Sequence, residues 1–306
     1  MCTAVRFTDE VGGMFFGRNL DWSFGYGERV LRTPVDADVP RAFERPDDPA
    51  RGHAVIGMGI VEEGVPLYFD CGNDAGLAVA GLNFPQSARY SSAPVEGTVN
   101  VAAYELPYWI ARNFSSVAEV RAALARVTVV ARAVSERLPV ASLHWIVADA
   151  TGSIVVECLE RGLTVWEDDV DALANEPEFG WHRQNLRNYL LLETAEPAAA
   201  AWGSASLAPF GSGAGMRGMP GDYCSPARLA KAAFVNAHYP AQRGERDNVT
   251  RLFRTLGSVA VPMGCAQEAD GSWERTIYTS GFSAATLTYY HATYDDPQVR
   301  AYPLAG

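Results

Sequence analysis

The feature that most constrains the fold is the opening segment, which favours a β-hairpin. Residues 3–7 are β-prone, residues 8–13 (TDEVGG) contain turn formers, and an apolar run resumes at Met14. An antiparallel ladder folded about that turn pairs positions whose numbers sum to about 20 to 22. The hairpin therefore predicts that Cys2 lies opposite the stretch from Arg18 to Leu20.

Further strands are expected in the middle and near the end of the chain, with helices in blocks between them. Strands are predicted at 53–61, 77–82, 143–148, 153–158, 163–166, 276–280 and 286–291, and helices at 101–113, 117–127, 178–193, 226–238 and 245–256. Ser116 and Glu119 form a capping box, and Ser225 before Pro226 fits an N-cap followed by the first helical position. With no repeat and only residues 195–201 resembling a loose connection, the pattern predicts one α+β domain over 1–306.

Composition narrows the class of protein. The chain has 306 residues, 48% of them hydrophobic and 20% charged, which is typical of a globular protein. No apolar stretch is long enough to span a bilayer, and the first residues lack the features of a secretory signal, so a cytoplasmic protein is expected. Five cysteines without a CxxC pair indicate neither a disulfide framework nor a zinc site.

The net charge limits the partners. A formal charge of −11 without a basic run argues against nucleic acid. The same charge weakly repels an anionic small molecule, so any such substrate is expected to be held by local arginines.

Cys2 is the first candidate for chemistry. Initiator methionine is normally removed before a small side chain, which would leave a thiol and a free α-amine on Cys2. Such an amine ordinarily has a pKa of about 7.7–8.0, which suits a group that both accepts and donates a proton. By itself Cys2 is more often merely a small residue after the start methionine, so the hypothesis of a nucleophile with its own base depends on its neighbours.

Arg18 and Asp21, in residues 16–22 (FGRNLDW), support that hypothesis. A cation in a half-buried strand needs a partner, and Arg18 would favour a Cys2 thiolate. Asp21 could accept hydrogen bonds from the α-ammonium. Strand alternation puts positions 18 and 21 on opposite faces, so the strand is expected to end or twist near Leu20. The alternative is a surface Arg–Asp pair of little consequence.

Three residues from later segments are further candidates. Arg228 falls in the first turn of a predicted helix, where the dipole disfavours a cation, so it is either solvated or paired with a thiolate or an anionic substrate. Asn83 follows a strand and Asn175 precedes a helix. Both are candidate donors to an oxyanion, although isolated asparagines are more often turn residues.

Other polar residues offer weaker signals. The five histidines are scattered without metal-ligand spacing, and His144, in an apolar strand, is expected to be a satisfied core histidine. The glycine-rich stretch 211–215 lacks the lysine and serine of a phosphate loop. The sequence therefore predicts neither a metal site nor a cofactor.

Taken together, these residues resemble the choloylglycine hydrolase family, which contains bile salt hydrolases and penicillin V acylases. The resemblance spans nearly the whole chain. It is carried, in one order, by residues 1–3 (MCT), 16–21 (FGRNLD), 73–77 (NDAGL), 81–85 (GLNFP), 113–117 (NFSSV), 143–145 (LHW), 173–177 (LANEP) and 220–222 (PGD), followed by Arg228.

The resemblance implies an N-terminal-nucleophile hydrolase fold, a four-layer αββα sandwich often assembled as a homotetramer. It implies that Cys2 is the nucleophile once Met1 is removed. The supporting residues that it implies are Arg18, Asp21, Asn83, Asn175 and Arg228. Asparagine at position 83 resembles the bile salt hydrolase branch, whereas penicillin V acylases tend to have tyrosine there.

The implied activity is cleavage of glycine- or taurine-conjugated bile salts through a thioester. Phe24, Tyr26, Met58 and Ile60 are the implied lining of a steroid groove, although all four could equally be core. One alternative keeps the chemistry but acts on penicillin V or another N-acyl amide. Others are a catalytically silent steroid- or acyl-binding protein that retains Met1, and a metal-dependent amidase.

Overall fold

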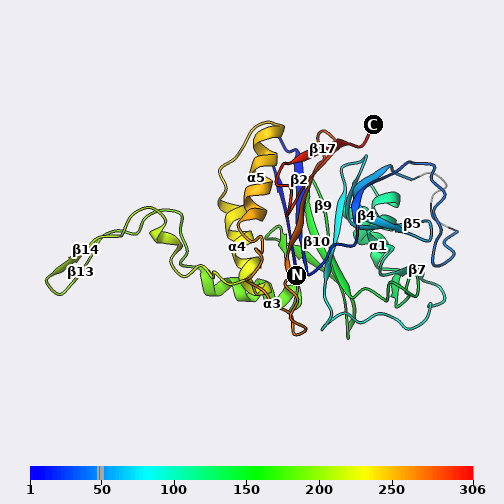
Figure 1. The fold of residues 1–306 in the computed structure, drawn as a ribbon, viewed down its shortest axis with the longest axis horizontal. Coiled ribbons are helices and arrows are strands. Elements are labelled where there is room, and N and C mark those ends of the chain that lie inside the picture. Colours follow the sequence, from blue (N-terminus) through cyan, green and yellow to red (C-terminus); the bar gives the residue numbers. More distant parts are fainter. Residues whose placement is uncertain (47, 49–51, 306) are drawn as a thin grey trace.

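Two antiparallel sheets packed face to face form the centre of the molecule (Figure 1). The computed structural model describes residues 1–46, 48 and 52–305. The six-stranded sheet has the order β12 (Ala172–Leu173), β1 (Cys2–Thr8), β2 (Met14–Trp22), β15 (Arg275–Ser283), β16 (Thr288–Thr293), β17 (Arg300–Pro303). The seven-stranded sheet has the order β11 (Gly162–Asp168), β10 (Gly152–Leu159), β9 (Leu143–Asp149), β6 (Ala78–Asn83), β5 (Val65–Asn73), β4 (Val55–Glu62), β3 (Arg29–Thr33).

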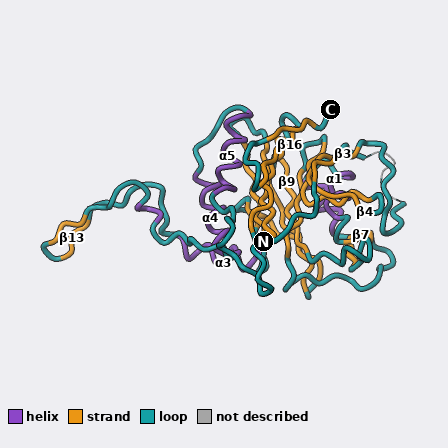
Figure 2. The backbone as a smooth tube through the Cα atoms, viewed as in Figure 1, coloured by secondary structure: helices purple, strands orange, loops and turns teal. Residues whose placement is uncertain are grey.

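Helices cover the outer face of each sheet (Figure 2). Helices α4 (Ser225–His238) and α5 (Glu245–Gly257) pack on the six-stranded sheet, and α1 (Leu106–Asn113) and α2 (Val117–Leu124) pack on the seven-stranded sheet. Strand β2 shows how alternation builds these layers: Phe16 faces the other sheet, whereas Phe15 faces α5. The predicted αββα sandwich is confirmed.

The N-terminal hairpin has the predicted register. Cys2 pairs with Leu20, and the ladder continues to Thr8 opposite Met14. The turn is closed by Asp9, whose Oδ1 accepts the backbone N–H of Gly13 at 2.7 Å. This hairpin places the start of β1 in the interior of the six-stranded sheet, between β12 and β2.

The seven predicted strands outside the hairpin are all present, with ends displaced by at most three residues. The helices differ more. The helix predicted from residue 101 begins at Leu106, because residues 99–102 form β7 (Val99–Ala102), parallel to β8 (Val127–Val130). Valines favour extended backbone over helix in both segments. The capping box is half confirmed: Ser116 Oγ accepts the N–H of Glu119 at 3.3 Å.

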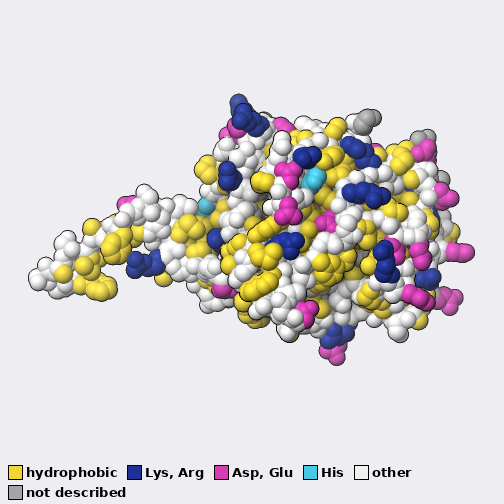
Figure 3. Space-filling model, in the orientation of Figure 1, with side chains coloured by type: hydrophobic (Ala, Val, Ile, Leu, Met, Phe, Trp, Pro, Cys, Tyr) yellow, Lys and Arg dark blue, Asp and Glu magenta, His cyan; other side chains and the backbone are white. Residues whose placement is uncertain are grey.

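Residues 190–221 form a projecting arm that starts beside the sandwich, where Leu192 is largely buried, and then extends far from it (Figure 1). The helix predicted over 178–193 is α3 (Phe179–Asn185), continued by a 3-10 helix, η1 (Leu186–Tyr189), and then the chain enters the arm. The arm contains the hairpin of β13 (Ala200–Trp202) and β14 (Ala205–Leu207), then the short 3-10 helix η2 (Ala214–Met216). Its exposed apolar side chains include Leu191 (94% exposed), Trp202 (76%) and Phe210 (97%), and Figure 3 shows hydrophobic groups along it.

Candidate active site

Cys2 begins β1, and its sulfur lies in the gap between the two sheets. The residue is 2% exposed, and Sγ accepts a hydrogen bond of 2.7 Å from Nη2 of Arg18. Arg18 reaches the sulfur because β2 carries it on the face that points toward the other sheet, two residues from the partner of Cys2. The structure therefore brings together the cation and the thiol as the hairpin predicted.

The Arg18 guanidinium is completely buried, and three more of its five N–H groups donate to backbone carbonyls. These acceptors are Asn19 O (3.2 Å), Phe69 O (3.3 Å) and Gly81 O (3.0 Å). Burial by itself would lower the pKa of Arg18, but neighbouring negative charges, Cys2 foremost, outweigh burial and raise it. Arg18 is thus a fixed positive charge beside the sulfur.

Asn175 holds the nitrogen of Cys2. Its Oδ1 accepts the Cys2 N–H at 2.6 Å and a hydrogen bond from Arg228 Nη2 at 2.7 Å. Because a guanidinium only donates, this contact sets which end of the amide faces Cys2. The amide nitrogen donates to the backbone oxygen of Asn83 at 2.7 Å, and its second hydrogen has no partner among the described residues. The oxygen of Asn175 therefore has a positioning task that the sequence did not reveal.

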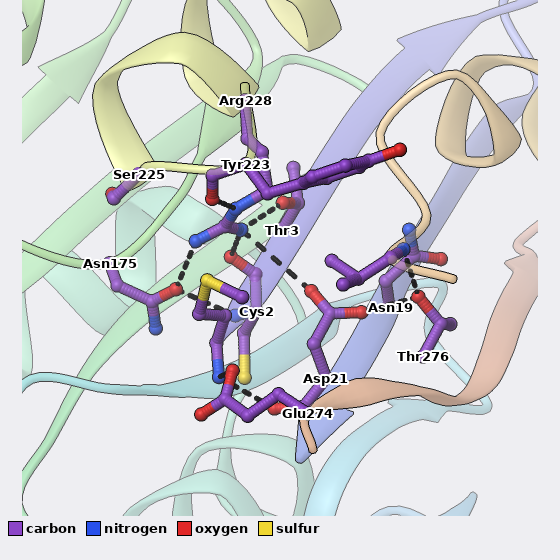
Figure 4. Close-up of polar contacts among 12 residues, drawn as sticks. Cys2, Thr3, Asn19, Asp21, Asn175, Tyr223, Ser225, Arg228, Glu274 and Thr276 are labelled. Atoms are coloured by element: carbon purple, nitrogen blue, oxygen red, sulfur yellow. Dashed lines mark hydrogen bonds and ion pairs between the residues drawn. The ribbon is translucent and has the colours of Figure 1, made fainter. Parts of the chain in front are cut away.

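The side chain of Arg228 extends from the first turn of α4 to Cys2, on the side opposite Arg18 (Figure 4). It donates to Cys2 O, Thr3 Oγ1 (2.5 Å), Asn175 Oδ1 (2.7 Å) and Tyr223 O (2.9 Å). Its Nη1 lies 3.8 Å from the carboxylate of Asp21. Burial lowers the pKa of Arg228, against the opposing effect of Asp21 and Cys2. The alternative of a solvated arginine is wrong, because Arg228 is 1% exposed. Its partners within the protein are the Asp21 carboxylate, two backbone oxygens and the side chains of Thr3 and Asn175; a substrate as a further partner stays a prediction.

Asp21 stays on the opposite face of β2 from Arg18. Of the two alternatives, an end or a twist near Leu20, the end is wrong, because β2 continues through Trp22; an irregularity does lie there, since the register of β15 shifts between the partners of Leu20 and Asp21. The two residues have no need to converge. Cys2 is approached from both faces of the sheet, at its sulfur by Arg18 and at its carbonyl by Arg228.

The Asp21 carboxylate is completely buried. Its Oδ1 accepts from Thr276 Oγ1 at 2.6 Å, while Oδ2 has no hydrogen-bond donor within the described part of the chain. The ammonium of Met1 donates to the backbone oxygen of Asp21 at 2.6 Å and to the Glu274 carboxylate at 2.9 Å. With Met1 attached, the terminal ammonium thus contacts the backbone of Asp21, not its side chain.

Two residues that the sequence did not single out fix the loop of Asn175. Glu176 accepts hydrogen bonds from Gln86 N, Ser87 N and Ser87 Oγ, which ties this loop to the segment after Asn83. His182, in α3, hydrogen-bonds the backbone oxygen of Asn175 at 2.8 Å. Burial lowers the pKa of His182 to about 4, so the ring is neutral and its Nε2–H is the donor. No spacing in the sequence signals either role.

A cavity of about 390 Å³ opens above the Cys2 sulfur, within the size range of small-molecule sites, roughly 300–1,000 Å³. Its lining is mainly apolar and comes from both sheets and from the loop before β9: Leu20, Trp22, Tyr26, Ile60, Leu67, Tyr68, Phe69, Pro85, Tyr104, Val134, Leu138, Pro139, Val140, Ala141 and Leu143, with Cys2, Arg18, Gly81, Asn83 and Ser142. Arg18 is the one arginine in this described lining, and four of its five N–H groups already donate within the protein. The expectation that local arginines hold an anionic substrate stays a prediction.

The four expected lining residues divide evenly. Tyr26 and Ile60 line the cavity. Met58 is 2% exposed and packs in the core between the sheets, so the second reading of this residue, as core, is correct. Phe24 is 53% exposed and packs on Tyr26, with ring centres 5.0 Å apart, outside the lining.

The environment of Cys2 separates it from the other cysteines, all of which are free. Burial raises the pKa of Cys158 to about 12 and that of Cys71 well above its usual value.

His144 is buried as expected, but only one ring nitrogen is bonded, to Glu157 at 3.2 Å. Within the described ranges, no group of three or more His, Cys, Asp or Glu side chains is placed to hold a metal ion, and no helix could cross a membrane.

The αββα sandwich, with a cysteine at the start of a central strand, defines the N-terminal-nucleophile class of hydrolase folds. The chain belongs to the choloylglycine hydrolase family of linear amide C–N hydrolases, whose sequence pattern matches residues 2–306.

Individual relatives agree with this placement. The chain is 52% identical over 307 aligned residues to a bile salt hydrolase/transferase of Bifidobacterium longum subsp. longum, covering 100% of this chain and 96% of that protein. Its structure is similar to that of a mutant conjugated bile acid hydrolase from Clostridium perfringens, with a TM-score of 0.91, 31% identity and coverage of 100% and 94%. A penicillin V acylase from Agrobacterium tumefaciens shares the fold, with a TM-score of 0.74 and 17% identity over 99% of this chain and 86% of that one.

Proposed function

We propose that this enzyme hydrolyses the amide bond of glycine- or taurine-conjugated bile salts, with Cys2 as the nucleophile after removal of Met1. The observation that carries the proposal is a buried thiol, hydrogen-bonded to an arginine, at the base of a largely apolar cavity of about 390 Å³. A steroid is a large, rigid apolar body, which suits such a lining. The names of the relatives support the same substrate class.

In the acylation half, the thiol proton passes to the Cys2 amine and the thiolate attacks the amide carbon. A C–S bond forms, and the carbonyl oxygen becomes an oxyanion beside Asn83 and the free hydrogen of Asn175. The C–N bond then breaks, and the leaving amine takes a proton from the Cys2 ammonium, which leaves a thioester. Arg18 favours the thiolate by its charge.

In the deacylation half, the neutral Cys2 amine removes a proton from water, which attacks the thioester carbon. The C–S bond breaks, the bile acid leaves, and the thiolate is restored. Asn175 orients the amine through Oδ1, and Arg228 holds both Asn175 and the Cys2 carbonyl. Asp21 sustains the charge of Arg228 from 3.8 Å, and we propose that its side chain also receives the ammonium once Met1 is gone.

The test compares Cys2→Ala with the parent enzyme, measuring release of glycine from glycocholate and the intact mass of each protein. Alanine also permits removal of Met1, so the variant keeps the free amine and loses only the sulfur. We expect loss of amino acid release in Cys2→Ala and unchanged release in Cys265→Ala, which removes an exposed thiol. Full activity in Cys2→Ala, or in a protein whose mass includes Met1, contradicts the mechanism.

The substrate is tested separately from the chemistry. Turnover of glycocholate, taurocholate and penicillin V on one preparation is expected to favour the bile salts. Faster cleavage of penicillin V would be consistent with Cys2 as the nucleophile but would contradict the proposed substrate class.

We further propose that residues 2–306 act as one catalytic unit in the cytoplasm, assembled as a homo-oligomer, the tetramer that the family resemblance implies. The exposed apolar side chains of the projecting arm support association, because isolated protomers rarely expose such groups together. Free thiols suit a reducing compartment. Light scattering of the variant Trp202→Ser/Phe210→Ser is expected to give a smaller assembly than the parent; an unchanged mass contradicts the role of the arm.

A further inference from the structure

A buried acid that the proposed mechanism does not use lies near Arg18. Asp70, in β5, is 2% exposed. Its carboxylate accepts hydrogen bonds from Tyr278 Oη (2.6 Å), Tyr289 Oη (2.6 Å) and Ser280 Oγ (2.9 Å), which all belong to the opposite sheet. Three hydroxyl donors favour the ionised form of Asp70, because a carboxylate only accepts hydrogen bonds. A protonated acid would carry an O–H group of its own that needs an acceptor.

This acid is connected to Arg18 by its immediate neighbours. Ser280, which donates to Asp70, is paired with Arg18 across the β2–β15 ladder. Phe69, next to Asp70 in β5, supplies one of the carbonyl acceptors of the Arg18 guanidinium. The ring of Tyr278 lies 5.9 Å from the centre of the same guanidinium. Asp70 and Arg18 are therefore a buried carboxyl group and a buried cation held in one cluster between the sheets.

Arg18 needs a second negative charge because the state of Cys2 changes during the reaction. Apart from the sulfur, the acceptors of Arg18 are neutral carbonyls. Whenever the sulfur is a thiol or a thioester, it carries no charge, and an uncompensated buried cation is strongly unfavourable. A permanent anion nearby removes this difficulty.

We propose that Asp70 is a positioning residue that serves as the permanent counter-ion of Arg18, keeping that arginine charged and in place while the Cys2 sulfur is neutral. The inference rests on the proposed role of Cys2 as the nucleophile. Asp70 acts through Arg18 and does not touch the cavity.

The surrounding groups define the charge balance. Burial raises the pKa of Asp70, and Arg18 and the three hydroxyl donors oppose that rise. Burial, then Asp70 itself, raises the pKa of Tyr278 and Tyr289 well above the usual value, so both remain protonated donors. The titratable or charged groups on this side of the six-stranded sheet are Cys2, Arg18, Tyr26, Cys71, Tyr278, Tyr289 and His291, whereas Asp21 and Arg228 act from its other face.

The experiment follows alkylation of Cys2 by iodoacetamide against pH, read by peptide mass spectrometry with the exposed Cys265 as an internal reference. In Asp70→Asn the thiolate becomes the main anion facing Arg18. We expect the alkylation midpoint to move to lower pH by about one unit. A more strongly held thiolate is also a weaker nucleophile, so kcat for glycocholate should fall about threefold with little change in KM. A purely structural role would lower stability and leave the midpoint unchanged.

Two tyrosine variants complete the test. Tyr289→Phe removes one donor to Asp70 and is expected to shift the midpoint in the same direction by less. Tyr290→Phe is its matched control, because the neighbouring hydroxyl donates to Glu245 at 2.7 Å, on the helix side of the same strand; we expect no shift. If Asp70→Asn does not fold, the alkylation midpoint of Tyr289→Phe alone tests the role of Asp70.

The inference is overturned if the variants of Asp70 and Tyr289 alkylate with the midpoint of the parent. It is also overturned, together with the proposed function, if Cys2 in the parent is no more reactive than Cys265 at any pH. The two failures are therefore distinguishable.

Discussion

The ion pair between Arg228 and Asp21 gives the sharpest test of how the site is held together. Arg228→Leu removes four hydrogen bonds, to Cys2, Thr3, Asn175 and Tyr223. It also leaves Asp21 completely buried without its cation, 3.8 Å away in the parent. Asp21→Asn is expected to destabilise the protein less, because Arg228 keeps its four neutral hydrogen-bond acceptors.

The magnitudes follow from this asymmetry. Removing one partner of a buried ion pair costs about 3–5 kcal/mol, which we expect for Arg228→Leu. Asp21→Asn should cost about 1–3 kcal/mol, the usual range for a buried polar group with an imperfect partner. The double variant leaves no isolated charge, so it should be more stable than the sum of the single effects predicts by about 1–3 kcal/mol.

The assay is urea unfolding of the parent, both single variants and the double variant at one protein concentration, combined with glycine release from glycocholate. Stability should be partly restored in the double variant. Activity should not, because Asn175 and the Cys2 carbonyl still lack their anchor, and a misplaced reacting group costs about 10²-fold in rate. Stability effects that add to within about 0.5 kcal/mol would refute the coupling of these two charges. Restored activity would refute the positioning role of Arg228.

Three further predictions concern the cavity, the core and the pH dependence of stability. Met58→Ala should lower the free energy of unfolding by about 2–5 kcal/mol without changing KM for glycocholate, because Met58 is a core residue; a raised KM contradicts this placement. Leu138→Glu, in the loop before β9, should raise KM at least about tenfold and leave Cys2 alkylation unchanged, because it puts a charge in an apolar lining; equal KM values would remove Leu138 from the site. Burial, with the nearby Asp171, raises the pKa of Asp168 to about 7 from an ordinary value of 3.8, so its contribution to stability is present below about pH 4 and is lost as pH rises through about 7. Asp168→Asn should therefore gain in urea midpoint relative to the parent between about pH 4 and pH 7, and a constant difference would contradict the assignment.

Local patterns were sufficient for much of the fold. The turn at residues 8–13 and the apolar runs on either side predicted the register that puts Arg18 beside Cys2. Periodicity and capping also located α4 and α5 closely. The errors came where a valine-rich segment found a strand partner, as at β7 and β8, and where Leu190 and Leu191 entered the projecting arm instead of extending a helix. In each case the competing partner lies outside the window that a local pattern covers.

The roles of individual atoms could not be predicted from the sequence. The pattern identified Asn175, Asp21 and Arg228 as candidates, but not that Asn175 turns its oxygen toward Cys2 or that Arg228 pairs with Asp21. Asp70 gave the same kind of signal as Arg18, a charge inside an apolar strand, yet its strand, β5, was not predicted. Pro66 near its start, unfavourable within a strand, weakened that pattern.

By itself the sequence determined most of the strands and helices and the candidate reactive side chains, because hydrophobic alternation, turn chemistry and capping act over a few residues. The four layers were implied by the family resemblance, not by these local patterns. Tertiary structure alone decided which atoms of those side chains meet. Cys2 is bonded to Asn175, 173 residues away, and Asp70 to Tyr289, 219 residues away. Such contacts depend on how two sheets and a helix pack against one another, and on the need of every buried charge for a partner, which no local pattern encodes.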